Sequence, residues 1–237
     1  MTARADSPSR PGWLAPLGWV TALALVAAQA VGLLTSPPDR GMGDLQKIMY
    51  VHAPTAWASL VGFGVVFVAS ILYLWRREPR HDLLAAAAAE VSTVLTGLTL
   101  ALGAIWGRPT WGVWWTWDPR LTSTAILLLI MVGYLALRAF TEEEEKRARW
   151  SAAVGILGFI NVPIVYMSVQ WWRTLHPLQS TGSTVDPAYA PGLVLNGIAF
   201  LLVLIYFTGS RYYIARLERA AETRLADRGL EGGPERG

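Results

Sequence analysis

Residues 111–137 of the chain read WGVWWTWDPRLTSTAILLLIMVGYLAL. The second part of this stretch, residues 121–137, carries no charge and is dominated by leucine, isoleucine and other apolar residues. A helix rises about 1.5 Å per residue, so such a run crosses most of the roughly 30 Å hydrocarbon core of a bilayer. The first part places Trp111, Trp114, Trp115 and Trp117 just before Asp118. We therefore predict a tryptophan-rich loop at a membrane surface, followed by a transmembrane helix.

Similar apolar blocks lie on both sides of this stretch. Of the 237 residues, 53% are hydrophobic and 16% are charged, whereas a soluble domain carries about 25% charge. We predict an all-α integral membrane protein: a bundle of six transmembrane helices with short interfacial segments on the outer face. The whole chain, residues 1–237, is predicted to form one domain, with residues 210–237 as a basic inner tail. The predicted spans are residues 14–34, 53–75, 83–105, 121–140, 151–169 and 192–209.

The positions of lysine and arginine predict the orientation of the bundle, because cytoplasmic loops carry an excess of these residues. With the N-terminus inside, fifteen of the 20 cations lie in inner segments. The other five are Arg40, Lys47, Arg108, Arg120 and Arg173. Both termini are therefore expected inside, and the basic ends are read as topology signals, so no nucleic-acid partner is expected. Ala28-Gln29-Ala30 resembles a signal-peptide cleavage site, but the preceding apolar run is long for a signal peptide, and we expect an uncleaved first helix.

Two of the three histidines, His52 and His176, fall in predicted outer loops. The third, His81, lies between Arg80 and Asp82 in an inner loop, where we expect a solvated surface residue. The chain has no cysteine, which rules out disulfides and the C-x-x-C-H signature of covalent haem attachment.

Three kinds of function could explain the residues found in the predicted outer loops. A tryptophan belt at the interface explains single rings at helix ends, but not five tryptophans within residues 106–117. Zinc needs three or four protein ligands, and the loops have only scattered aspartates beside the histidines. A flat apolar haem needs two axial ligands, aromatic contacts and cations for its propionates. The candidate binding residues are His52, His176, Trp106, Trp111, Trp114, Trp115, Trp117, Asp118, Arg120, Arg108, Trp171, Trp172 and Arg173. Asp118 is also expected to cap the helix that starts at Pro119.

Three segments carry a resemblance to a known family. WGVWWTWDPRLTS, at residues 111–123, looks like the tryptophan-rich WWD signature of bacterial haem-handling membrane proteins. KIMYVHAPTAW, at residues 47–57, and NVPIVYMSVQWWRTLHPLQS, at residues 161–180, resemble the flanks of the two histidines in the haem exporter protein C (CcmC) family of the cytochrome c maturation system.

The resemblance implies non-covalent binding of haem b at the periplasmic face of the bacterial inner membrane. His52 and His176 would be the axial iron ligands, and the tryptophan segment the platform. Its implied partners are the haem chaperone CcmE, the small membrane protein CcmD, the ABC transporter subunits CcmA and CcmB, and membrane lipid. The chain would bind and deliver haem without being an enzyme. Two alternatives remain: a transporter that moves haem across the membrane, and a haem-handling protein of the other cytochrome c assembly pathway.

Few polar groups lie within the predicted spans. Glu90 is the only carboxylate well inside one, and such a group either marks a haem path or pairs with a polar group of a neighbouring helix. Asn161 and Pro163 predict a kink in the fifth span, where the asparagine side chain can bond the freed carbonyls.

Overall fold

The computed structural model describes residues 9–176 and 185–231. Throughout these residues there are helices and loops but no β-strand, and six segments are long and apolar enough to span a membrane. The predicted all-α bundle of six spans is confirmed. The helices are α1 (Leu14–Ala30), α2 (Met49–Arg76), α3 (Pro79–Trp111), α4 (Pro119–Phe140), α5 (Glu144–Phe159), α6 (Asn161–Trp171) and α7 (Ala190–Glu231), with the short turns η1 (Val31–Thr35) and η2 (Asp44–Ile48) between α1 and α2.

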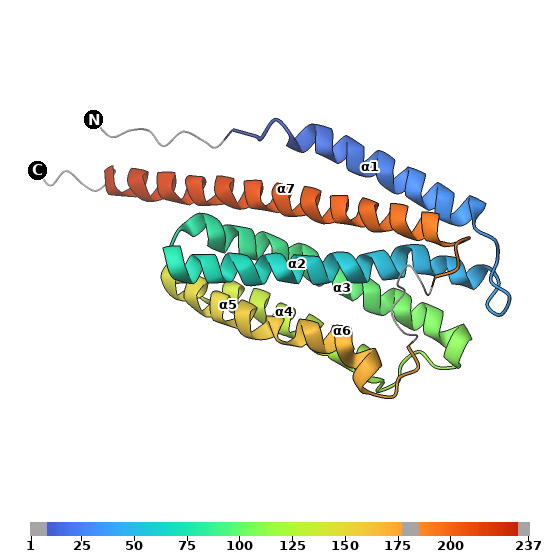
Figure 1. The fold of residues 1–237 in the computed structure, drawn as a ribbon. Helices are drawn as coiled ribbons and strands as arrows, with labels where there is room; N and C mark the ends of the chain where they lie inside the picture. Colours follow the sequence, from blue (N-terminus) through green and yellow to red (C-terminus); the bar gives the residue numbers. More distant parts are fainter. Residues whose placement is uncertain (1–8, 177–184, 232–237) are drawn as a thin grey trace, which may run out of the picture.

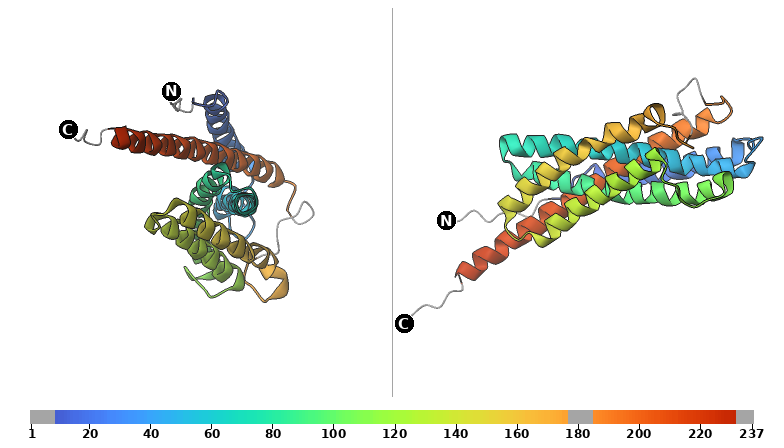
Figure 2. Two further views of the ribbon diagram at one scale, coloured as in Figure 1. Left: turned by 90° about the vertical axis from the view of Figure 1, so that its left-hand side faces the viewer. Right: turned by 90° about the horizontal axis from the view of Figure 1, so that it is seen from below.

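The helices form three groups (Figures 1 and 2). The centre is the antiparallel pair α2 and α3; α1 and α7 lie together on one side of it, and α4, α5 and α6 on the other. Small residues allow α2 and α3 to approach closely, as is usual where helices pack in membranes. A side chain at Gly62 would lie within 1.9 Å of Ser92 Oγ, and alanines at residues 85–89 are all buried.

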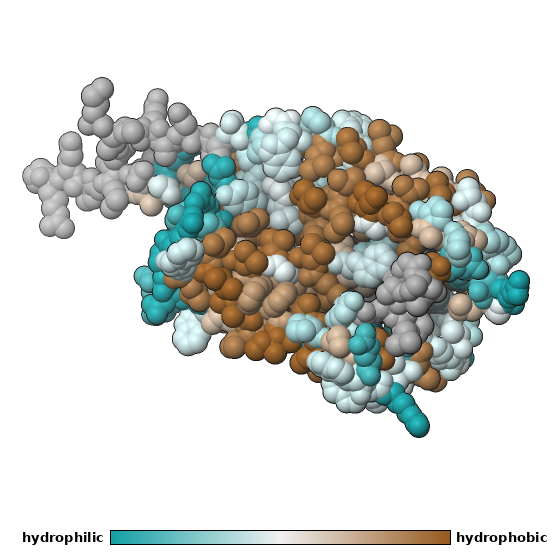
Figure 3. All heavy atoms as spheres, viewed as in Figure 1, coloured by the Kyte–Doolittle hydropathy of each residue, from teal (hydrophilic) through white to brown (hydrophobic). Residues whose placement is uncertain are grey.

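The two ends of the bundle differ. α1 begins and α7 ends at the same end, which we call the terminal end (Figure 1). The connections η1–η2, α3–α4 and α6–α7 meet at the opposite end, which we call the histidine end because His52 and His176 lie there. Figure 3 shows apolar side chains across the middle of the face viewed and polar side chains toward the two ends. The chain is a multi-pass membrane protein.

Several helix ends differ from the prediction. α2 begins at Met49, before the predicted span of residues 53–75, so Pro54 lies inside the helix. α3 continues to Trp111, so Trp106 and Arg108 are helical and the connection to α4 is shorter than expected. Pro54 lies near the start of α2 and Pro109 in the last turn of α3. α7 extends through Glu231 where a tail was expected from residue 210.

The fifth span consists of α5 and α6, which are separated at Ile160, next to the kink predicted at Asn161 and Pro163. Asn161 is buried, and its Nδ2 donates a hydrogen bond to the Ser123 carbonyl of α4 at 2.8 Å. The asparagine therefore bonds a neighbouring helix rather than the freed carbonyls of its own, and it holds α6 against α4.

Polar residues at the terminal end are paired between helices. Glu90 of α3 forms an ion pair with Arg211 of α7, with 2.9 Å between Oε1 and Nη2, which is the pairing that its position in a span suggested. Asp82 of α3 similarly accepts hydrogen bonds from Arg138 of α4. His81 is only 9% exposed, so the expected solvated surface position was wrong. The α2–α3 connection is only two residues long, so His81 falls in the first turn of α3 and packs into the bundle.

Candidate functional site

A cavity of about 640 Å³ lies at the histidine end between α2, α3, α4 and α6 and their connecting loops. This is within the roughly 300–1,000 Å³ typical of small-molecule sites. Much of its wall is apolar and aromatic. The structure brings seven of the predicted site residues into this wall: His52, His176, Trp106, Trp111, Trp114, Trp115 and Arg120.

His52 enters the cavity from the first turns of α2 and faces α3. Its Nδ1 lies 3.1 Å from the carbonyl oxygen of Thr99. A carbonyl can only accept, so Nδ1 carries the proton of this bond in the neutral ring. Nε2 is then the nitrogen with a lone pair for a metal, and the bond to Thr99 fixes the plane of the ring.

His176 follows α6, and hydrogen bonds to Asp118 hold the backbone that leads to His176. Asp118 Oδ1 accepts from Arg120 N at 2.9 Å and so caps α4, as predicted. Its Oδ2 accepts from Thr174 Oγ1 at 2.6 Å and from Leu175 N at 2.8 Å. Thr174 Oγ1 in turn accepts from His176 N at 3.0 Å. One carboxylate therefore connects the start of α4 to the segment that carries the second histidine.

These hydrogen bonds also set the charge of Asp118, whose side chain is buried. Burial alone raises the pKa of a carboxyl group, but the donors from Thr174, Leu175 and the first turn of α4 outweigh it. The pKa of Asp118 is consequently held below its usual value, and the group is a carboxylate at neutral pH.

The two imidazoles lie close to each other in the cavity wall. Their ring centroids are 6.3 Å apart, with 32° between the ring planes. Two imidazoles that coordinate one metal from opposite sides, each at roughly 2 Å, have centroids about 6 Å apart. The separation matches that of a pair that shares one metal ion.

Two tryptophans pack edge-on against these imidazoles. Trp106 lies 5.8 Å from His52 and Trp111 lies 6.3 Å from His176, between ring centroids. Trp114 and Trp115 also line the cavity but are 59% and 39% exposed, which places them at its mouth. The tryptophan segment therefore forms one wall and part of the rim.

The structure does not bring six other predicted residues into the cavity wall: Asp118, which supports His176 from behind the wall, and Trp117, Trp171, Trp172, Arg108 and Arg173. Trp117 is 82% exposed and packs edge-on against Trp115. Arg108 is directed to the end of its own helix, where it donates to the Gly112 carbonyl. Trp171 and Trp172 pack on each other at the end of α6, and both are largely exposed, as is Arg173.

Arg120 is the predicted arginine that the fold directs into the cavity wall. Its Nη1 is buried and has no hydrogen-bond partner among the residues that the structure describes. A buried guanidinium nitrogen without a partner is unfavourable unless a ligand supplies an acceptor. Arg40, from the loop before η2, also lines the cavity and was not predicted.

Three further residues escaped sequence analysis although they position the histidines. Thr99 supplies the carbonyl that orients His52, and Thr174 links Asp118 to His176. A Cβ on Gly103 would lie 3.1 Å from His52 Cε1, so a glycine leaves room for that ring. One signal was available: residues 99, 103 and 106 fall at helical spacing on one face of α3, the face that ends in Trp106.

Comparison with known proteins gives a consistent result. Residues 9–227 match the family model described as heme exporter protein C. A heme exporter protein C of Bradyrhizobium diazoefficiens is 40% identical over 196 residues, which is 80% of this chain and 74% of the relative. One from Haemophilus influenzae is 36% identical over 217 residues, 89% of this chain and 88% of the relative. One from Escherichia coli K12 is 35% identical over 201 residues, covering 81% and 79%. The chain belongs to the CcmC family of heme exporter proteins.

Proposed function

We propose that the histidine end binds haem b non-covalently and presents it to the haem chaperone CcmE during cytochrome c maturation. The observation that supports this most directly is the imidazole pair, 6.3 Å apart inside a largely apolar cavity. Two imidazoles complete the coordination of an iron that already has four porphyrin nitrogens. The chain acts in this proposal as a binding and delivery subunit rather than as an enzyme.

The surrounding residues suit the other parts of a haem. Trp106 packs edge-on against His52 and Trp111 against His176, and both offer aromatic surface to a porphyrin. The buried Nη1 of Arg120 is suited to a propionate, and Arg40 is a second cation in the wall. Trp114 and Trp115 at the mouth would contact the exposed edge of the haem. Trp117, Trp171, Trp172, Arg108 and Arg173 would then act at the surface around the mouth.

We assign the histidine end to the periplasmic side of the bacterial inner membrane. The distribution of lysine and arginine supports this orientation, since only five of the 20 cations belong to the segments that connect spans at the histidine end. The mouth of the cavity would then face CcmE. CcmD, CcmA and CcmB are proposed as further partners on the basis of the family.

The packing of the bundle favours delivery over transport by this chain alone. Below the cavity, Phe63, Val66, Leu127, Met131 and Val165 form a packed apolar cluster between α2, α4 and α6. This cluster fills the interior of that side of the bundle, and a haem would have to break it to pass through.

Haem transfer to the chaperone tests the proposed function. Purified chain loaded with haem should pass it to the soluble domain of apo-CcmE, which would acquire the haem absorbance after the two are separated. Chain carrying His52→Ala, incubated with the same haem, is the control for free haem in solution. Equal acquisition from both samples would show that the histidine site does not deliver the haem.

Enlarging Gly103 should displace His52 without unfolding the protein. A Cβ there would already be 3.1 Å from the imidazole, so the branched side chain of Gly103→Val should rotate the ring away from His176. We expect haem affinity to fall by about 10- to 100-fold, as when the support of a metal ligand is lost. The measurement is haem titration followed by absorbance.

Gly97→Val is the matched control for this prediction. Gly97 is in the same helix, and a Cβ added to it would meet no neighbouring atom within 4 Å. Equal loss of haem affinity in both variants would mean that the effect arises from α3 itself and not from contact with His52.

A further inference from the structure

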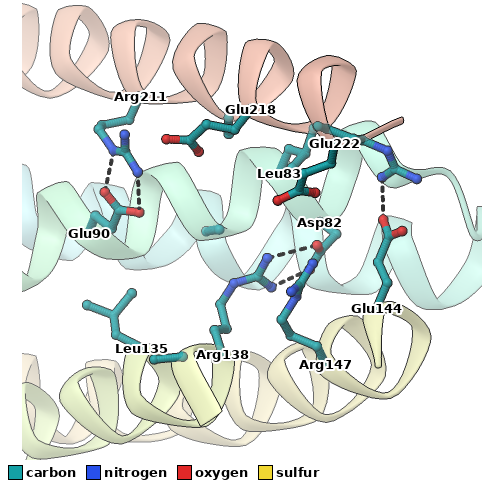
Figure 4. A pocket seen from close by; sticks show the side chains of 14 residues that line it. Asp82, Leu83, Glu90, Leu135, Arg138, Glu144, Arg147, Arg211, Glu218 and Glu222 are labelled. Atoms are coloured by element: carbon teal, nitrogen blue, oxygen red, sulfur yellow. Dashed lines mark hydrogen bonds and ion pairs between the residues drawn. The ribbon is translucent and has the colours of Figure 1, made fainter. Parts of the chain in front are cut away.

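A second cavity, of about 480 Å³, lies at the terminal end of the bundle. Figure 4 shows the side chains that line it. α3, α4, α5 and α7 form its walls. Five carboxylates and four guanidinium groups line it, together with Leu83, Leu135 and three alanines. The haem-binding function proposed above makes no use of this cavity.

Three ion pairs join the helices around this cavity. Arg138 pairs with Asp82 between α4 and α3, with 2.9 Å between Nη2 and Oδ2. Arg211 pairs with Glu90 between α7 and α3, and Arg219 pairs with Glu144 between α7 and α5 at 2.6 Å. α7 packs mainly on α1, α2 and α3, so the cavity fills the space between α7 and the α4–α5 side. The ion pairs fix the width of this space.

The remaining charges are divided between opposite walls. Glu218 and Glu222 project from α7 into the cavity, and Arg147 extends into it from α5 (Figure 4). Arg147 Nε is buried and has no hydrogen-bond partner among the described residues. One wall therefore offers acceptors for a cation, and the other offers a donor for an anion.

We propose that this cavity binds the headgroup of a phospholipid that carries both a phosphate and a primary ammonium, the phosphoethanolamine type. Arg147 binds the phosphate, and Glu218 and Glu222 accept hydrogen bonds from the ammonium. With the three ion pairs formed, a purely anionic headgroup would be repelled by Glu218 and Glu222, and a purely cationic one by Arg147. A choline headgroup has no N–H to donate to the two glutamates. The apolar residues Leu83 and Leu135 of the cavity wall are available to contact the carbon atoms of the headgroup.

The position of the cavity agrees with a lipid ligand. It is bounded by the first turns of α3 and α5 and the last turns of α4, which are the ends of membrane spans. A headgroup is present at this depth of a bilayer at high local concentration, so even a modest preference fills the site. In the orientation proposed above, this is the inner leaflet.

Lipid retention tests the proposal. The full-length protein is reconstituted into nanodiscs that contain equal parts of phosphatidylethanolamine, phosphatidylcholine and phosphatidylglycerol with identical acyl chains. Lipids that stay bound after transfer to detergent are identified by native mass spectrometry. We expect phosphatidylethanolamine to be retained about tenfold over each of the others, since charge-assisted hydrogen bonds distinguish it.

Variants test the contribution of each cavity wall separately. Arg147→Gln and the double variant Glu218→Gln/Glu222→Gln should each lose the preference, while Glu142→Gln, an exposed residue outside the cavity, should keep it. Thermal unfolding of each variant confirms that the bundle is intact. Retention without lipid preference, a preference for phosphatidylglycerol, or equal thermal stabilisation by soluble phosphoethanolamine and by the lipid would each overturn the proposal.

Discussion

Replacing either His52 or His176 by alanine should abolish the low-spin absorption spectrum of the haem-loaded protein and weaken haem binding more than about 100-fold. The two rings are 6.3 Å apart, so each can supply one axial ligand, and loss of one leaves the iron five-coordinate or bound to water. The expected loss exceeds the roughly 10- to 100-fold typical when only a supporting contact of a ligand is removed. Absorbance of the detergent-purified protein, titrated with haem, measures both effects.

His81→Ala is the matched control, because it removes the same side chain from the terminal end of the bundle. His81 is buried, so this variant can lower thermal stability, but its haem spectrum should equal that of the wild type. A low-spin spectrum that survives in both His52→Ala and His176→Ala would exclude the axial roles of these residues.

The six spans were predictable from sequence because lipid and helix packing both demand apolar residues over a fixed length. The helix ends were less predictable, since tryptophan, glycine and proline mark both interfaces and loops. Residues 106–111 illustrate this: they were expected in a loop, yet they continue α3. Arg108 supports this continuation by donating to Gly112 at the end of the helix, a contact that composition does not reveal.

The candidate site was predictable in part for a related reason. His52, His176 and the tryptophans stand out because they are rare residue types in loops at one face of a membrane protein. The direction of each side chain depends on tertiary contacts, so sequence could not distinguish Arg120, which lines the cavity, from Arg108 and Arg173, which do not. Thr174 carries no distinctive signal, because it acts through an ordinary hydroxyl. Thr99 acts through its backbone carbonyl, and only its helical spacing to Trp106 could have indicated its role.

Asp118→Asn should lower haem affinity by about 10- to 100-fold while leaving the bundle folded. Asparagine is as good a helix cap as aspartate, so one oxygen can still accept from Arg120 N. The amide then places an NH₂ group where Oδ2 accepts from Thr174 and Leu175. This NH₂ group would then oppose the N–H of Leu175, and two donors cannot form a hydrogen bond. The segment that carries His176 would therefore lose its attachment to the start of α4. Haem titration measures the affinity, and thermal unfolding measures the bundle.

Thr174→Val separates the link to His176 from the cap, because it removes the hydroxyl that joins Asp118 to His176 N and leaves α4 capped. It should reproduce most of the loss in haem affinity, whereas Asp44→Asn, an exposed outer aspartate outside the cavity wall, should cause none. Full affinity in Thr174→Val would assign the effect of Asp118 to its hydrogen bond with Leu175 N instead.

The direction in which the pKa of Asp118 is shifted predicts how haem affinity depends on pH. The pKa of the carboxyl in the folded protein is below its ordinary value of 3.8, so the stabilisation from its ionised form is fully present above that value. It is lost only as the pH falls through the lower, folded-state pKa. The ratio of haem affinities between wild type and Asp118→Asn should therefore be constant from about pH 5 to pH 8. A ratio that changes across this range would mean that another titrating group, and not the Asp118 carboxylate, holds His176 in place.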